Sequence, residues 1–438
     1  MSIAAPGKVA YINARIIDPA TGFDGPGELL TIGEEIADVG RKLFEGKPPK
    51  DVQIIDCDGQ CLAPGLVDMR VQLREPGEEH KESLKSGCEA AVAGGVTTMV
   101  GLPNTNPIID DEATVEYVAR RARKQALTKV YVYGAATKGL LGKELAEMGL
   151  LAEAGALGFT DATKAIADAQ VLRRALAYAA TFNFLIIQHP EEPSLANGVM
   201  NTGEISTRMG LSGIPREAEI IMLERDLRLV AMTGARYHAA HISTAESVEI
   251  IARAKARGLN VTCDTAPFYF ALNEMAVGDY RTFAKLSPPL RTEDDRQAIV
   301  EGLRSGIIDC IASDHAPHDQ DSKRLPFAQA AFGGSGLETL LAVSIGLHHS
   351  ADMKLIDVLR RLTVEPAALL GLDAGRLAKG KKADLVMFDP DRGWKVVADD
   401  FRSKSKNSPF DGQPVQGKVL RTVIDGRCVF SATSGAVS

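Results

Sequence analysis

Eight short apolar segments recur through the middle of this chain, and each is followed by a loop and then by a helical pattern. This alternation constrains the fold more than any other feature of the sequence, because it repeats the order strand, loop, helix eight times. Eight β/α repeats in about 300 residues are typical of a TIM barrel, a closed (β/α)8 sheet with its helices outside. The eight segments are LVDMRVQL, TTMVGLP, KVYVYGA, ALGFTD, FLIIQH, ARYHAAH, LNVTCD and IIDCIASD.

The two ends of the chain have a different pattern. Short strands broken by Gly and Asp turns fill residues 1–62, as in KVAYINARII followed by DPATG. A similar pattern returns in residues 372–438, as in GKVLRTVIDGRCVF. Because strands at both ends can pair with each other, we expect one small β-sandwich domain built from 1–62 and 372–438, beside a barrel domain of 63–371.

Local signals mark two of the expected helices. HISTAESVEII has Ser243 and Glu246 at the spacing of a capping box, which predicts that a helix begins there. TEDDRQAIVEGLRSG has acidic residues early and Gly306 late, which predicts a helix that ends at this glycine.

Composition and charge argue against several classes of partner. The chain of 438 residues has a net charge of −7, and it contains no long block of Lys or Arg. Nucleic acid and anionic membranes are therefore poor partners. No apolar run is long enough to span a bilayer, and the N-terminus lacks the apolar core of a signal peptide, so we expect a cytoplasmic protein. None of the six cysteines forms a CxxC pair, which favours reduced thiols over disulfides or a cysteine-based zinc site.

Polar side chains gather at the carboxyl ends of the predicted strands, where a TIM barrel carries its active site. The first strand ends in Arg70, Gln72 and Arg74, which alternate along the chain and so share one face. The other candidates are Asn104 after the second strand, Asp161 on the fourth, His189 on the fifth, His241 on the sixth and Asp314 on the eighth, with His315 and His318 just beyond. Two His and two Asp with one open position would suit zinc or a similar divalent metal, whose bound water attacks the substrate in many hydrolases.

Over nearly its whole length the chain resembles the dihydroorotases of the amidohydrolase superfamily. The resemblance is carried by APGLVD, LREPGEEHKES, AAVAGGVTTMVGLPNTNP, HISTAES, SPPLR, IASDHAPH and GRLAKGKKADLVMFDP. It implies a metal-binding TIM barrel flanked by a β-sandwich from both termini. It also implies reversible closure of N-carbamoyl-L-aspartate to dihydroorotate, a step of pyrimidine biosynthesis. The resemblance would make His189, His241 and Asp314 metal ligands or catalytic groups, and Arg74, Asn104 and His318 contacts to the substrate carboxylate. Asp161 is the candidate for a metal ligand on the fourth strand.

Departures from the family pattern cluster on the same rim. The family's first strand carries two histidines where this chain has Arg70 and Gln72. The second acid of the family's fourth-strand motif is Ala162 here, and the family's Pro-His-His after the seventh strand is Pro-Phe-Tyr at 267–269. The family's Asn before Pro-Pro-Leu-Arg is Ser287.

Arg70 changes the chemistry that this rim can support. A guanidinium is always protonated in a protein, so it cannot ligate a cation and would repel one. We therefore predict that Arg70 replaces the lost metal and pairs with Asp314 or Asp161, and that the site holds one zinc at most.

Three functions follow from these observations. The first is a dihydroorotase-like protein with little or no activity that serves as a partner of aspartate carbamoyltransferase, as the resemblance to inactive bacterial homologues implies. The second is an active single-zinc dihydroorotase that uses His189, His241 and Asp161, with Asp314 as the proton carrier. The third is a cyclic-amide hydrolase of hydantoinase or allantoinase type, in which Lys164 would be the modified lysine of the fourth strand. We favour the first; a retained pocket for a small carboxylate and a homo-oligomer are compatible with it.

Overall fold

The computed structural model describes residues 7–44, 51–125 and 127–432, so the outer ends of the predicted terminal domain, 1–6 and 433–438, lie outside the described residues.

In the middle of the chain all eight predicted strand segments are present, the third as two pieces separated by one residue. The strands are β6 (Leu66–Val71), β7 (Val96–Gly101), β8 (Lys129–Val132) with β9 (Gly134–Ala135), β10 (Phe159–Thr160), β11 (Leu185–Gln188), β14 (Arg236–Ala239), β15 (Val261–Thr265) and β16 (Cys310–Ile311).

These strands run parallel in two sheets, of order β6-β7-β8 and β9-β10-β11-β14-β15-β16. Backbone hydrogen bonds connect the sheets on both sides: Leu157 N donates to Val132 O over 3.0 Å, and Gln72 N donates to His315 O over 2.9 Å. Every residue of β6, β7 and β11 is buried, which explains why these segments are apolar almost throughout rather than alternating.

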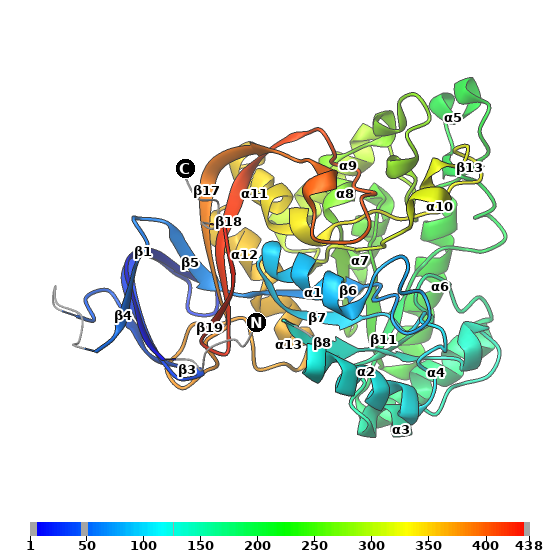
Figure 1. The fold of residues 1–438 in the computed structure, drawn as a ribbon. Coiled ribbons are helices and arrows are strands. Elements are labelled where there is room, and N and C mark those ends of the chain that lie inside the picture. Colours follow the sequence, from blue (N-terminus) through cyan, green and yellow to red (C-terminus); the bar gives the residue numbers. More distant parts are fainter. Residues whose placement is uncertain (1–6, 45–50, 126, 433–438) are drawn as a thin grey trace.

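Helices follow the strands and surround them (Figure 1). The longer helices are α1 (Leu84–Ala93), α2 (Glu112–Gln125), α4 (Ala169–Phe182), α6 (Glu217–Thr233), α7 (Ala245–Ala256), α9 (Glu293–Ser305), α11 (Leu340–Ser350), α12 (Leu355–Leu362) and α13 (Val364–Leu370). Short helices and a small parallel strand pair lie in the loops: α3 (Met148–Glu153), α5 (Glu204–Met209), α8 (Pro267–Ala271), α10 (Gln320–Arg324), β12 (Met200–Asn201) and β13 (Gly213–Ile214).

The two predicted helix signals have different outcomes. Helix α9 ends at Gly306, whose backbone is left-handed, as the sequence predicted. The predicted capping box at Ser243 is wrong by one residue: Thr244 caps α7 by accepting from Ser247 N, and Ser243 instead contacts Glu219. The Ser243 hydroxyl donates instead to the buried Glu219 carboxylate, because a hydrogen bond to a charged acceptor is stronger than one to a neutral group.

Strands from both ends of the chain form one further sheet, at the end of the molecule away from α5 (Figure 1). Its strands are β1 (Lys8–Asp18), β2 (Phe23–Ile32), β3 (Glu35–Gly40), β4 (Gln53–Asp56), β5 (Cys61–Pro64), β17 (Leu385–Lys395), β18 (Pro414–Ile424) and β19 (Arg427–Ser431). The order is β19-β18-β17-β5-β1-β2-β3, with β4 also on β1, and the antiparallel pair β5–β17 joins the two ends. The expected pairing of the termini is confirmed, as one continuous sheet. Strand β5 crosses the predicted domain boundary at residue 62, and that boundary stays a prediction.

Two apolar cores support this arrangement. The larger core lies between the parallel strands and their helices and extends to Phe388 of β17; the smaller one, around Leu29 and Leu385, lies within the terminal sheet. Five of the six cysteines are buried. Among the described residues, no helix is both long and apolar enough to cross a membrane.

Replacing Phe388 with alanine should lower the free energy of unfolding by about 3–5 kcal/mol, because this ring is fully buried in the core that β17 shares with the parallel strands. Urea denaturation followed by circular dichroism measures the change. As a control, Val397→Ala removes an apolar side chain that is 40% exposed and should cost less than about 0.5 kcal/mol. If both variants lost the same free energy of unfolding, Phe388 would not be part of the core that β17 shares with the parallel strands.

Candidate functional site

Arg70, at the end of β6, lies at the centre of the site and is paired with Asp314. Arg70 Nε donates to Asp314 Oδ1 over 2.9 Å, and Arg70 Nη2 donates to the carbonyl oxygen of Ala162 over 3.2 Å. Arg70 is only 2% exposed. A buried guanidinium is stable only with a nearby carboxylate and further acceptors. Of the two carboxylates expected as its partner, the structure brings Asp314 to Arg70.

Hydrogen bonds continue from Asp314 through both histidines. Asp314 Oδ2 lies 3.1 Å from His241 Nδ1, and His241 Nε2 lies 2.7 Å from His189 Nδ1. On the far side, His189 Nε2 lies 3.3 Å from Glu191 Oε2. All of these side chains are buried. The site is therefore a buried row of a cation, a carboxylate, two imidazoles and a second carboxylate.

The two carboxylates fix the proton positions in this row. Burial opposes their ionisation, but His241 and Arg70 hold the pKa of Asp314 below its ordinary value, and His189 and Arg291 do the same for Glu191. Ionised carboxylates only accept hydrogen bonds, so His241 Nδ1 and His189 Nε2 must both donate. The contact between the two rings needs one more proton. Burial and the Arg70 cation oppose this additional proton, because they lower the pKa of His241.

The residues as arranged do not fit a zinc ion. Zinc would have to replace the proton between His189 Nδ1 and His241 Nε2, and it would need at least one more protein ligand. Asp161 was the candidate for that place, but the structure does not bring Asp161 to the histidines: its oxygens accept from the backbone nitrogen of Thr137, over 2.9 Å, and from the Thr137 hydroxyl. Across the described ranges, no group of three or more His, Cys, Asp or Glu is placed to hold a metal ion. The Arg70 cation beside the histidines opposes one further.

The three side chains expected on a substrate carboxylate contact protein groups instead. Arg74 Nη2 lies 3.3 Å from His318 Nε2, and Arg74 Nη1 donates to Glu78 Oε2 over 3.0 Å. Asn104 Nδ2 donates to Gln72 Oε1 over 3.2 Å. The structure thus brings Arg74 and His318 together, and it pairs Asn104 with one of the residues that replace the family's histidines.

Four positions of this rim have a left-handed backbone: Arg74 (φ 61°), Ala162 (φ 61°), His241 (φ 38°) and Asp314 (φ 47°). Residues with a Cβ pay a conformational cost there, and such positions cluster at functional sites. These four left-handed positions therefore mark the ends of β6, β10, β14 and β16 as the rim of the candidate site.

Sequence reasoning missed Glu191. It binds His189 from the next loop, and the only signal was an acid two residues after the histidine in HPEEP. Tyr269, which the sequence had placed on this rim, packs edge-on against His241, with ring centroids 6.4 Å apart.

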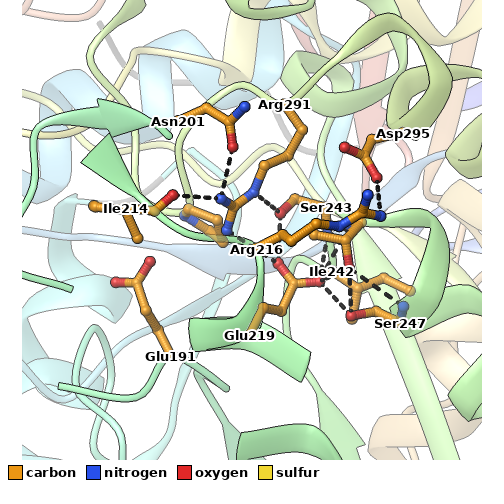
Figure 2. Close-up of polar contacts among 12 residues, drawn as sticks. Glu191, Asn201, Ile214, Arg216, Glu219, Ile242, Ser243, Ser247, Arg291 and Asp295 are labelled. Atoms are coloured by element: carbon orange, nitrogen blue, oxygen red, sulfur yellow. Dashed lines mark hydrogen bonds and ion pairs between the residues drawn. The ribbon is translucent and has the colours of Figure 1, made fainter. Parts of the chain in front are cut away.

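Behind the histidines, the HISTAES and SPPLR motifs meet around two buried charges, Glu219 and Arg291 (Figure 2). Glu219 accepts from Ser243 N over 2.9 Å, and Arg291 Nη1 donates to Asn201 Oδ1 over 3.0 Å. Arg291 Nη2 and Glu219 Oε2 are 3.9 Å apart. These motifs fix the loops around the site, and His241, the first residue of HISTAES, belongs to the row of charges itself.

Replacing Arg70 with methionine should lower the free energy of unfolding at pH 7 by about 3–5 kcal/mol, because Asp314 is left buried without its cation. The double variant Arg70→Met/Asp314→Asn removes both charges and should recover most of that loss. A single variant as stable as the wild type, or a double variant no more stable than the single one, would contradict the pairing.

The difference between the wild type and Arg70→Met should shrink as the pH falls below about 4. The pKa of Asp314 is lowered in the fold, so its pairing stabilises the protein above the unfolded-state pKa and is lost as the pH falls through the folded-state pKa. Urea denaturation at a series of pH values measures this; a difference that grows in acid would be the contrary result.

Comparisons with known proteins agree with the fold and the motifs. The family model described as Dihydro-orotase-like matches residues 59–247. A protein named Dihydroorotase from Anaplasma phagocytophilum (strain HZ) is 48% identical over 428 residues, covering 97% of this chain and 95% of that protein. Another, from Pelobacter propionicus (strain DSM 2379 / NBRC 103807 / OttBd1), is 46% identical over 419 residues, covering 95% and 98%.

Among solved structures, L-hydantoinase (dihydropyrimidinase) from Arthrobacter aurescens matches with a TM-score of 0.86 at 25% identity, covering 97% of this chain and 96% of that one. Dihydropyrimidinase from Brevibacillus agri NCHU1002 matches with a TM-score of 0.81 at 22% identity, covering 97% and 95%, and shares the fold. With nearly half of its residues identical to a dihydroorotase over almost the full length, this chain belongs to the dihydroorotase family.

Proposed function

We propose that this chain acts without catalysis, as a cytoplasmic partner of aspartate carbamoyltransferase in pyrimidine biosynthesis. The observation that carries the proposal is the buried ion pair between Arg70 and Asp314, 2.9 Å apart. In this arrangement a guanidinium neutralises the carboxylate that a metal-dependent relative would use. The contacts of Asp161, which accepts from Thr137 instead of facing the histidines, support the same view. The partner is chosen because aspartate carbamoyltransferase makes the N-carbamoyl-L-aspartate on which the family acts.

A second candidate is an active dihydroorotase with a single zinc ion. It is favoured by the two facing nitrogens, His189 Nδ1 and His241 Nε2, which are 2.7 Å apart and could both bind one metal. It is also favoured by the relatives at 43–48% identity that are named Dihydroorotase. For this function Asp161 would have to leave Thr137 and turn to the histidines.

We also propose that the parallel strands form one closed (β/α)8 barrel, with 63–371 as its domain. The hydrogen bonds that connect β6 and β8 to the other sheet support closure. In this arrangement the row from Arg70 to Glu191 crosses the mouth of the barrel, where family members carry out ring closure.

Purified protein should contain far less than one zinc per chain and should not hydrolyse dihydroorotate, even with added zinc. Metal content is measured by mass spectrometry, and hydrolysis by the loss of dihydroorotate absorbance. Co-expressed aspartate carbamoyltransferase should elute with the chain in size-exclusion chromatography. About one zinc per chain together with turnover would overturn the proposal and establish the second candidate.

The variant Arg70→His/Gln72→His removes the cation and supplies the family's two histidines, so it should bind more zinc than the wild type. Its matched control, Arg70→Met/Gln72→Met, removes the cation without adding ligands. Equal zinc content in the two variants would show that Arg70 and Gln72 are not what keeps the metal out.

A further inference from the structure

A cavity of about 770 Å³ lies where β17, β18 and β19 of the terminal sheet meet α1 and α11 (Figure 1). Its volume is within the range for small-molecule sites, ~300–1,000 Å³. None of the described residues that line it belongs to the row from Arg70 to Glu191. The cavity is therefore separate from the candidate site at the strand ends.

Two aromatic rings of the cavity lining each lie against a cation. Lys418 Nζ is 3.9 Å from the ring centroid of Trp394, which is the one tryptophan of the chain. The guanidinium carbon of Arg402 is 5.5 Å from the ring centroid of Phe430. The indole ring is held in place, because Trp394 Nε1 donates to the carbonyl oxygen of Gly417 over 2.8 Å. The cavity thus offers flat apolar surface next to positive charge.

Three cations line the cavity without an ion pair. No carboxylate oxygen of the described residues lies within 4.0 Å of the side-chain nitrogens of Lys395, Arg402 or Lys418. Lys418 is only partly buried, so the N–H groups of its ammonium remain open to a ligand in the cavity. Burial, and after it the Arg392 cation, lowers the pKa of Lys418. An anion bound beside Lys418 would offset both effects.

Acidic residues also line the cavity, and they limit the charge that a ligand can carry. Glu338 and Asp400 attract the Lys418 cation, although they do not compensate for its burial. Burial raises the pKa of Glu338 to about 7, so this acid is partly protonated at neutral pH and repels an anion less than an ordinary carboxylate does. The lining therefore suits one anionic group beside Lys418 better than a highly charged ligand.

The two pairs of ring and cation are separated along β18. Phe430 pairs with Thr422 of this strand, which is four residues from Lys418. At about 3.3 Å per residue, this separation is roughly 13 Å between backbone positions. A free phosphate ion or a single aromatic ring is too short to contact both pairs. A ligand that uses both needs a flat ring and an anionic group joined by a spacer.

We propose that this cavity binds a nucleoside monophosphate. The phosphate pairs with Lys418, the ribose is the spacer, and the base packs against Phe430 beside the Arg402 guanidinium. Nucleic acid bases stack on aromatic rings and on guanidinium planes in many proteins. Binding of this ligand needs neither a zinc ion nor turnover, so the inference goes beyond the proposed function and does not rest on it.

Isothermal titration calorimetry of the full chain tests the inference with adenosine 5′-monophosphate, adenosine and ribose 5-phosphate. The nucleotide should bind, and the other two probes should each bind at least tenfold more weakly, because each lacks one of the two groups that the cavity contacts. Trp394 provides a second readout, since it is the only tryptophan and lies against Lys418. Its fluorescence should change with the same midpoint as the calorimetric signal.

Lys418→Gln should weaken binding of the nucleotide by about tenfold, because a charge-assisted hydrogen bond to the phosphate is lost, and should leave adenosine unaffected. Phe430→Leu should weaken both by about fivefold or more, because the stacking surface is lost. The matched control is Lys379→Gln, which removes an exposed lysine outside the lining and should change nothing. Arg402→Gln replaces Lys418→Gln as the test if the latter does not keep the wild-type unfolding midpoint.

Any one of four results would overturn the inference: no binding of the nucleotide at millimolar concentration, ribose 5-phosphate binding as tightly as the nucleotide, equal losses in the Lys418 and Lys379 variants, or binding without a change in the fluorescence of Trp394. The zinc, turnover and co-elution measurements decide the proposed function separately, so failure of one is not failure of the other.

Discussion

The ion pair between Arg70 and Asp314 is the interaction on which the buried row of Asp314, His241, His189 and Glu191 depends. It neutralises a carboxylate that would otherwise be buried alone, and through Asp314 it orients His241, which in turn meets His189. The row ends at Glu191, so two carboxylates flank the histidine pair. The Arg70 guanidinium supplies the positive charge that balances the buried Asp314 carboxylate.

The scaffold around the row of charges is rigidly built. Left-handed backbone at His241 and Asp314 and the buried Glu219–Arg291 network shape the same loops that a catalytic relative would need. These features are costly to build, and they persist here around a site without an assembled metal group.

Much of the fold could be predicted because the spacing of apolar residues along the chain follows which positions are buried. All eight central strands were identified from apolar segments, and the pairing of the two ends followed from their shared strand pattern. The prediction was weaker wherever one side chain could bind either of two partners. Ser243 could cap a helix or bind a carboxylate, and only the position of Glu219 decides between them. In the same way Asp161 could face the histidines or Thr137, and no local sequence signal distinguishes these rotamers. Glu191 was missed because an acid two residues after a histidine is common and meets the ring only through the loop that follows β11.

The antiparallel pair β5–β17 has a consequence for how the molecule is made. Leu62 pairs with Met387, so one edge of β5 stays unpaired until a strand more than three hundred residues later has been made. During synthesis the strands of the N-terminal segment leave the ribosome first, and their sheet is completed only when nearly the whole chain has emerged. Such distant pairing closes a long loop, which makes the last step of assembly slow and leaves an open strand edge in the meantime. Nascent chains of this protein therefore depend on protection from aggregation until their final quarter has been translated.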